Sequence, residues 1–133
     1  MIGLDTNLLI RYVTDDDAVQ SPQAAEFIES ELSAERPGFV SLVTLAELAW
    51  VLRSRHKATT PEVAVVVEEL VSDTKFRFQD DKSVWLALEL VDEGAPDFAD
   101  ALISAIGLRA GCRFTATFDR QAVKLTRMHA VGR

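Results

Sequence analysis

Residues 1–10 read Met-Ile-Gly-Leu-Asp-Thr-Asn-Leu-Leu-Ile, and within them a short apolar run ends in a carboxylate. Met1 to Leu4 has the composition of a core strand, and Asp5 follows it directly. Moving an ionised carboxylate out of water is costly unless it is paired, hydrogen-bonded or bound to a metal ion. We therefore expect Asp5 to lie at the carboxyl end of a first strand, beside groups that compensate its charge, with a short helix over residues 7–13.

The composition is that of a globular protein with an acidic balance. Of the 133 residues, 48% are hydrophobic and 26% are charged, and the formal net charge at pH 7 is -7. The length predicts a single domain over residues 1–133. The negative charge argues against a protein that binds nucleic acid only by covering phosphates with lysine and arginine. It does not exclude a nuclease, because bound cations reverse the local charge of a carboxylate cluster.

The apolar runs and the single cysteine bear on the compartment. No charged-then-apolar leader is recognised, and no apolar run reaches the roughly 20 residues that a bilayer span needs. The one cysteine, Cys112, stands among apolar neighbours, so we expect it to be a small buried hydrophobe. These features predict a cytoplasmic protein without a membrane partner.

Strand-like and helical segments alternate along the chain. The helices are predicted near residues 21–33, 44–55, 60–71, 82–93 and 97–111, with Ser21, Thr44 and Thr60 as N-caps. Strands are expected at residues 1–4, 38–43, 76–79, 113–119 and 128–131. This alternation predicts an α/β fold, a three-layer α/β/α sandwich around a mainly parallel sheet of four to five strands.

Several carboxylates stand beside apolar sequence rather than in polar turns: Asp5, Glu47, Asp97, Asp100 and Asp119. Each alone is explained by the stabilisation that an acid gives to a helix N-terminus. Together they indicate a shared site, because a right-handed βαβ fold brings strand ends and adjoining helix N-termini to one edge of the sheet. Carboxylates gathered there would repel one another, and Mg²⁺ or Mn²⁺, which take oxygen ligands, would relieve the repulsion. Such a site suits phosphoryl chemistry.

Asp97 and Asp100 stand three residues apart and share one helix face. Either could be the metal ligand. Asp100 leads directly into an apolar ridge, whereas Asp97 has the position of an N-cap or a first-turn residue. We favour Asp100 as the ligand and Asp97 as its helper.

Four motifs carry a family resemblance: Asp-Thr-Asn at residues 5–7, Ala-Glu-Leu-Ala-Trp at 46–50, Asp-Phe-Ala-Asp-Ala-Leu-Ile-Ser-Ala at 97–105 and Thr-Phe-Asp at 117–119. In this order they resemble a PIN domain of the VapC toxin type, and the resemblance spans essentially the whole chain. It implies a Mg²⁺- or Mn²⁺-dependent ribonuclease that is paired with a VapB-like antitoxin and is usually dimeric. It also implies a catalytic, metal-binding quartet with supporting groups: Asp5, Glu47, Asp100 and Asp119, with Asp97 near the metal and Thr6, Asn7 and Thr117 orienting the acids.

From this quartet we expect a hydrolytic mechanism. Asp5 and Asp100 would hold the main metal ion, and Glu47 and Asp119 would complete the site or recruit a second ion. Water would be the nucleophile, because no serine, cysteine or histidine stands in a setting that suggests covalent catalysis.

Basic residues after two of the acids are candidate contacts to RNA phosphates. Arg120 and Lys124 follow the last acid, and Arg53 and Arg55 close the helix that carries Glu47. For Arg53 and Arg55, we favour an ordinary interaction with the C-terminus of their own helix over contact with RNA.

Two other functions are compatible with the same residues. A phosphatase with an aspartate nucleophile also places an acid after its first strand, but its chemistry requires a second acid two residues on, where this chain has Asn7. The second alternative is a catalytically silent module that uses the acidic site for binding alone.

Overall fold

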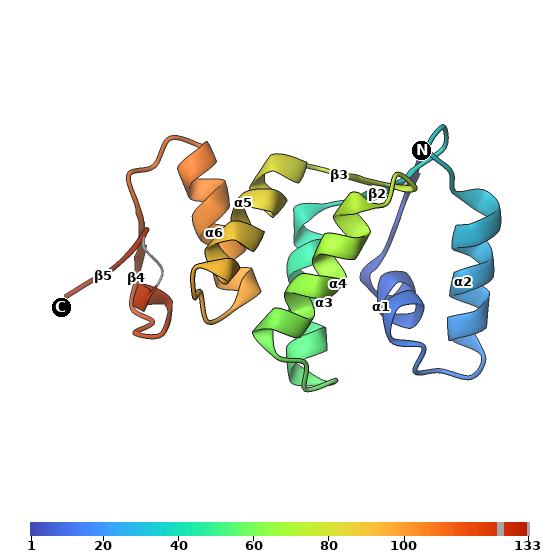
Figure 1. Ribbon diagram of the computed structural model, residues 1–133, viewed down its shortest axis with the longest axis horizontal. Helices are drawn as coiled ribbons and strands as arrows, with labels where there is room; N and C mark the ends of the chain where they lie inside the picture. The colour runs from blue at the N-terminus through green and yellow to red at the C-terminus, as the bar shows by residue number, and fades with distance from the viewer. Residues whose placement is uncertain (125–126, 133) are drawn as a thin grey trace.

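The computed structural model describes residues 1–124 and 127–132, and this part of the chain contains six α-helices and five short strands (Figure 1). The elements in chain order are β1 (Ile2–Gly3), α1 (Thr6–Thr14), α2 (Gln20–Glu31), β2 (Gly38–Val40), α3 (Leu42–Ser54), α4 (Thr60–Ser72), β3 (Phe76–Phe78), α5 (Asp81–Asp92), α6 (Phe98–Arg109), β4 (Thr115–Thr117), the 3-10 helix η1 (Ala122–Lys124) and β5 (Met128–Ala130).

The strands form two separate parallel sheets. The main sheet has the order β1-β2-β3, with Ile2 opposite Gly38 and Gly38 opposite Phe76. The second sheet pairs β4 with β5, with Thr115 opposite Met128. The predicted α/β sandwich with parallel strands is confirmed, although the main sheet has three strands rather than four or five. The reason is that α5 and α6 lie between the two sheets, so β4 does not reach the edge of β1 (Figure 1).

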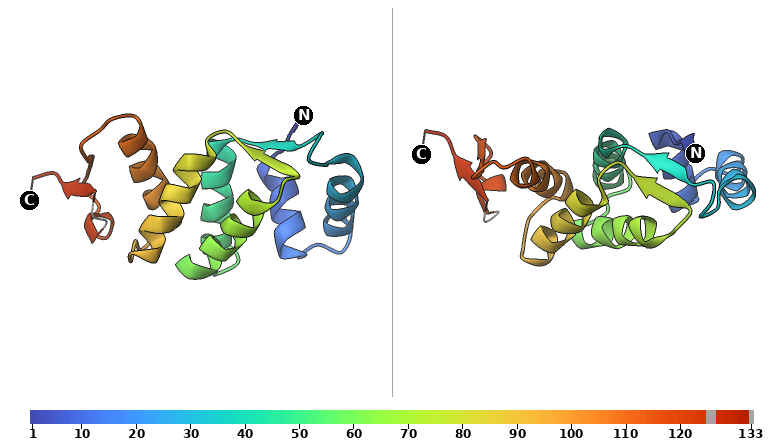
Figure 2. Two further views of the ribbon diagram at one scale, coloured as in Figure 1. Left: turned by 45° about the horizontal axis from the view of Figure 1, so that its top comes forward. Right: turned by 90° about the horizontal axis from the view of Figure 1, so that it is seen from above.

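The helices supply most of the buried apolar surface. Their apolar residues recur at helical spacing and meet in one cluster, whose fully buried members include Leu9, Ile28, Leu45, Val67 and Phe98. Figure 2 shows the helices arranged side by side along the long axis, with α2 at one end and β4 and β5 at the other. In the described residues, no helix is long and apolar enough to cross a membrane.

Three predicted N-caps are each displaced by one or a few residues. Thr59, rather than Thr60, caps α4 through a reciprocal pair of hydrogen bonds with Glu62. The hydroxyl of Ser41, rather than that of Thr44, accepts from the backbone of α3.

The start of α2 differs in the same way. The helix begins at Gln20, so Ser21 lies inside its first turn and is buried, and the prediction of Ser21 as the cap is wrong. The carboxylate of Asp17 accepts hydrogen bonds from the backbone N–H groups of Val19 and Gln20, at 2.9 and 2.7 Å.

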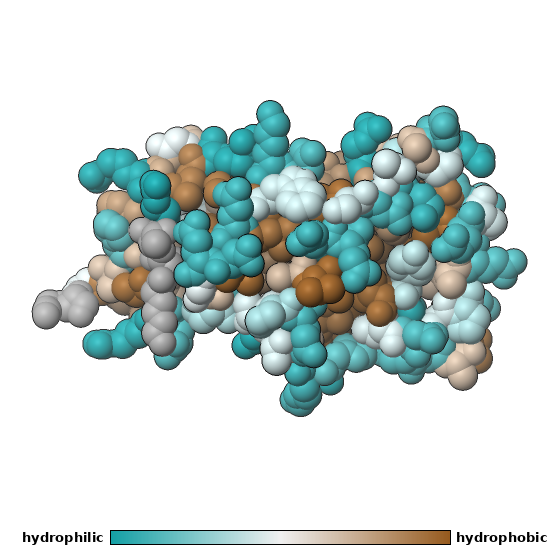
Figure 3. All heavy atoms as spheres, in the orientation of Figure 1, coloured by the Kyte–Doolittle hydropathy of each residue, from teal (hydrophilic) through white to brown (hydrophobic). Residues whose placement is uncertain are grey.

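Most of the surface drawn in Figure 3 is hydrophilic, with apolar side chains visible between the charged ones. Large exposed apolar side chains occur on α3, where Val43 is 78% and Trp50 is 61% exposed, and on α6, where Ile103 is 54% exposed. The single cysteine, Cys112, is exposed as well, so its predicted burial is wrong. It stands beyond the end of α6, outside the apolar face of that helix.

Candidate metal and nuclease site

The first group of site residues joins the start of α1 to α3. Thr6 is buried, and its hydroxyl donates a hydrogen bond of 2.5 Å to Oε1 of Glu47, which is 41 residues away in the chain. Asp5 precedes it in the N-cap position of α1, and its backbone carbonyl accepts from the N–H of Leu9. Its side chain makes no capping hydrogen bond and is exposed. The charge of Asp5 is therefore compensated by solvent and not by burial among protein partners.

The second group lies at the N-terminus of α6. Asp97 is the N-cap, and its Oδ2 accepts from the backbone N–H of Asp100 at 3.1 Å. Its other oxygen, Oδ1, lies 4.0 Å from Nε of Arg53. The interpretation of Asp97 as a cap is thus confirmed, and both of its oxygens have protein neighbours.

Asp100 stands in the first turn of α6, where it is half-buried. Burial raises the pKa of its carboxyl above the usual value, and the negative charges of Asp97 and Asp119 raise it further. The ionised form of Asp100 is therefore disfavoured in the metal-free protein, and a nearby cation would favour it.

Asp119 follows β4, as predicted, in an exposed turn. Its Oδ1 accepts from the backbone N–H of Gln121 at 2.9 Å, and its own N–H donates to Oγ1 of Thr117 at 2.9 Å. Thr117 therefore fixes the backbone at Asp119. This contact supports the predicted orienting role of Thr117, acting through the main chain and not through the carboxylate.

The four acids of the predicted quartet do not form one closed cluster. In the part of the chain that the structure describes, no three His, Cys, Asp or Glu side chains lie close enough together to hold one metal ion. Asp5 and Glu47 belong to the β1–α1–α3 side, whereas Asp100 and Asp119 interact at the start of α6. The strand that leads to Asp5, β1, and the strand that leads to Asp119, β4, belong to different sheets.

The remaining predicted residues have different surroundings. Asn7 is exposed and lines a hollow between α1 and α2 together with Arg11 and Gln20. Among the side-chain hydrogen bonds of the described residues, none joins Asn7 to Asp5, so the orienting role of Asn7 stays a prediction.

The basic side chains differ in whether they contact another predicted site residue. Arg55 is the exposed C-cap residue of α3. Arg120 is exposed beside Asp119, whereas Arg53 is engaged with the N-cap of α6. The side chain of Lys124 lies outside the described residues.

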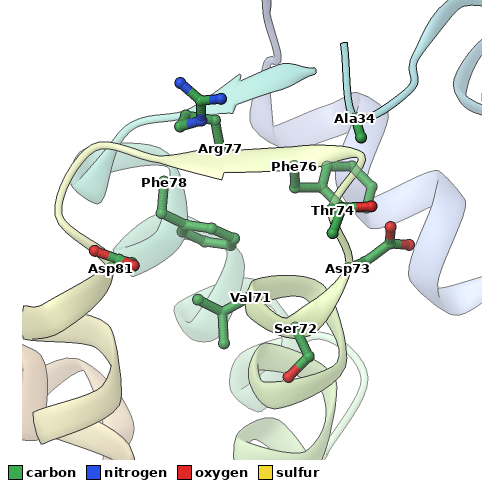
Figure 4. A pocket seen from close by; sticks show the side chains of 9 residues that line it. All are labelled: Ala34, Val71, Ser72, Asp73, Thr74, Phe76, Arg77, Phe78 and Asp81. Carbon is green, nitrogen blue, oxygen red and sulfur yellow. The ribbon is translucent and has the colours of Figure 1, made fainter. Parts of the chain in front are cut away.

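A hollow of about 420 Å³ lies beside β3 (Figure 4). Phe76 and Phe78 point into it, and Arg77 points to the other side of the strand. Asp73 and Asp81 stand at its edge, but no predicted catalytic acid lines it. This hollow is therefore not the predicted metal site.

Two residues with site contacts were not predicted. Phe118 is 82% exposed between Thr117 and Asp119, and it lines a hollow with Arg120. Its position between two predicted site residues was an available signal. Thr60 was predicted as a cap, whereas its hydroxyl donates to the carbonyl of Pro96, just before Asp97. Nothing in a single sequence indicates that contact, because the two residues are 36 positions apart.

Comparison with protein families gives a match over nearly the whole chain: the PIN domain family matches residues 2–128. The chain belongs to the PIN domain family. PIN domains are generally metal-dependent nucleases that act on RNA or DNA. No curated protein to which this PIN domain was compared matches it.

The side chains of this PIN domain fit a hard divalent cation in their chemistry and charge. All five predicted ligands are carboxylates, and Asp100 is crowded by like charges that a cation would neutralise. Mg²⁺ commonly keeps several waters and binds proteins through one or two carboxylates, so a closed set of three protein ligands is not required. Asp5, Glu47, Asp100 and Asp119 are the residues that would hold such an ion.

Proposed function

We propose that this PIN domain is a Mg²⁺- or Mn²⁺-dependent endoribonuclease and the toxin component of a VapBC-type toxin–antitoxin pair. The observation that carries the proposal is the crowding of carboxylates at the start of α6. There, burial raises the pKa of Asp100, the negative charges of Asp97 and Asp119 raise it further, and Arg53 is the cation beside Asp97. A carboxyl group whose ionised form is destabilised by burial and by neighbouring negative charges is typical of functional sites.

The proposed reaction is hydrolysis of a phosphodiester bond in RNA. A divalent cation held by these carboxylates would supply positive charge for the phosphate oxygens and would make the attacking water more acidic. The chain contributes the carboxylates of Asp5, Glu47, Asp100 and Asp119. Thr6 keeps Glu47 in place through its hydroxyl, and Thr117 keeps the turn at Asp119 in place.

RNA contact is proposed along the turn after β4. Arg120 would bind phosphate, and the exposed ring of Phe118 offers a surface for base stacking next to Asp119. Bases can stack in this way only when they are unpaired, so loops and single-stranded segments are the favoured substrates.

The proposed protein partners are a VapB-like antitoxin and a second copy of the chain. The exposed apolar residues of α3 and α6 support this part of the proposal, because the two helices pack against each other. Val43 and Trp50 on α3 and Ile103 on α6 would be covered by a partner. The substitution Trp50→Ser should weaken the self-association or antitoxin binding measured by sedimentation, and an unchanged sedimentation pattern would contradict this surface.

Cleavage of a mixed pool of structured and single-stranded RNA tests the proposed activity. The purified protein is incubated with Mg²⁺, with Mn²⁺ and with EDTA, beside Asp5→Asn and the control Asp92→Asn, which changes an exposed acid at the end of α5. We expect metal-dependent cutting that EDTA and Asp5→Asn abolish and that Asp92→Asn retains. Cutting that persists in EDTA and in Asp5→Asn, or no cutting by the folded protein, would contradict the proposal.

A further inference from the structure

The C-terminal end of α3, the start of α4 and the N-terminus of α6 meet at one polar contact. Thr60, the first residue of α4, is 8% exposed, and its hydroxyl donates to the carbonyl of Pro96 at 2.5 Å. The same hydroxyl accepts a hydrogen bond from the guanidinium of Arg53. Arg53 also reaches Asp97, with 4.0 Å between Nε and Oδ1. We call Arg53 and Thr60 the α6 clamp.

The α6 clamp acts on the two residues that lead into α6. Pro96 is held by its carbonyl and Asp97 by its side chain. Asp97 in turn accepts from the backbone N–H of Asp100 at 3.1 Å. An uninterrupted series of contacts therefore runs from the buried hydroxyl of Thr60 to the backbone of Asp100.

We propose that Arg53 and Thr60 are positioning residues for the metal site, which keep Asp97 in the capping position and thereby fix the direction in which Asp100 presents its carboxylate. This inference rests on the proposed function, because it gives Asp100 the role of a metal ligand. It assigns Arg53 to support of the acidic site in place of the RNA contact that its sequence suggested. Groups that orient a ligand through hydrogen bonds typically change metal affinity 10- to 100-fold when they are removed.

The chain offers a matched control for this contact. Thr59, next to Thr60, caps α4 through the hydroxyl that accepts from Glu62, and it has no contact with Pro96 or Arg53 among the hydrogen bonds of the described residues. Thr59→Ala therefore weakens the same helix start but leaves the α6 clamp intact. Thr60→Val removes the clamp hydroxyl at similar volume, and Thr60→Ser keeps it. Arg53→Gln tests the same contact should Thr60→Val fold poorly.

Two readouts decide the proposal: Mn²⁺ affinity by calorimetry and the backbone amide resonance of Asp100 in the metal-free protein. We expect Thr60→Val and Arg53→Gln to weaken Mn²⁺ binding about tenfold and to shift the Asp100 amide resonance. Thr60→Ser should restore both values, and Thr59→Ala should leave both unchanged.

The proposal is overturned if Thr60→Val keeps wild-type affinity, or if Thr59→Ala loses as much affinity as Thr60→Val. If the wild-type protein binds no Mn²⁺, the proposed function fails at this site. The Asp100 amide resonance of the metal-free protein then tests only whether the α6 clamp positions Asp100. A shifted resonance in Thr60→Val supports the α6 clamp, and an unchanged one overturns it.

Discussion

The hydrogen bond between Thr6 and Glu47 gives the sharpest test of how the site is built into the fold. It connects the start of α1 to α3 across 41 residues, and the hydroxyl donor is buried, at 6% exposure of Thr6. Thr6→Val replaces the hydroxyl by a methyl group of similar size, so it removes the bond without leaving a cavity.

The expected loss in the free energy of unfolding of Thr6→Val follows from the two groups that share the hydrogen bond. A hydrogen bond to a charged group contributes roughly 1.5–3 kcal/mol. Glu47 is exposed, so water rehydrates its carboxylate in the variant, and the lower limit applies, about 1.5 kcal/mol. For a chain of this size such a loss lowers Tm by roughly 5 °C.

Urea unfolding of Thr6→Val, Glu47→Ala and the double variant isolates the bond as a coupling free energy, which we expect to be about 1 kcal/mol. Thr14→Val is the matched control, because the hydroxyl of Thr14 bonds back to the carbonyl of Ile10 in its own helix, and its other partner, Asp16, is near in the chain and not on a distant segment. Its effect should stay within about 0.5 kcal/mol. A Thr6→Val loss no larger than that of the control, or a cycle without coupling, would refute the reasoning.

Three further predictions concern the fold around the site. Hydrogen bonds from the hydroxyl and N–H of Ser83, with Arg109 nearby, lower the pKa of Asp80. The contribution of Asp80 to the free energy of unfolding is therefore present above the unfolded pKa of about 3.9 and is lost as pH falls through the lowered folded pKa. In urea unfolding, Asp80→Asn should be less stable than the wild type at pH 7 and equally stable in strong acid, and a stability difference that does not change with pH would contradict this. Thr59→Ala should cost about 1 kcal/mol in urea unfolding, because it removes the N-cap of α4, and no loss would mean that the capping box is unimportant. Gly94→Ala should lower the free energy of unfolding by about 1–2 kcal/mol, because φ at Gly94 is +111° and the added Cβ strains the backbone there. Nothing contacts the added Cβ at either Gly94 or Gly3, so Gly3→Ala, at an ordinary φ, is the control and should cost less. Equal Tm values for the two variants would contradict backbone strain as the cause.

The sequence predicts elements well and their relative placement less well. Gly94 marks the end of α5, and Asp97, which was expected to be an N-cap or a first-turn residue, is the N-cap of α6. Which of two neighbouring hydroxyl residues caps a helix depends on the backbone angles at a single residue. Thr59 and Ser41 therefore took the positions that Thr60 and Thr44 were expected to have.

The arrangement of strands could not be read from local patterns. Asp5 and Asp119 each follow a strand, as predicted, but strand pairing depends on how α5 and α6 cross the molecule. In the structure β4 pairs with β5, and the negative charge of Asp119 acts on Asp100 at the start of α6. Long-range polar contacts were equally inaccessible: a buried hydroxyl at Thr60 and a carbonyl at Pro96 carry no pairing signal in one sequence.

Binding of Mn²⁺ to the acidic groups is the most direct test of the central claim that carboxylates from distant segments hold a catalytic cation. Equilibrium titration, followed by electron paramagnetic resonance of free Mn²⁺, compares the wild-type protein with Asp100→Asn and with the exposed-acid control Asp92→Asn. We expect saturable binding in the wild type and the control, and a loss of at least about tenfold in affinity in Asp100→Asn. Absence of binding in the wild type, or equal weakening in the two variants, would contradict the claim.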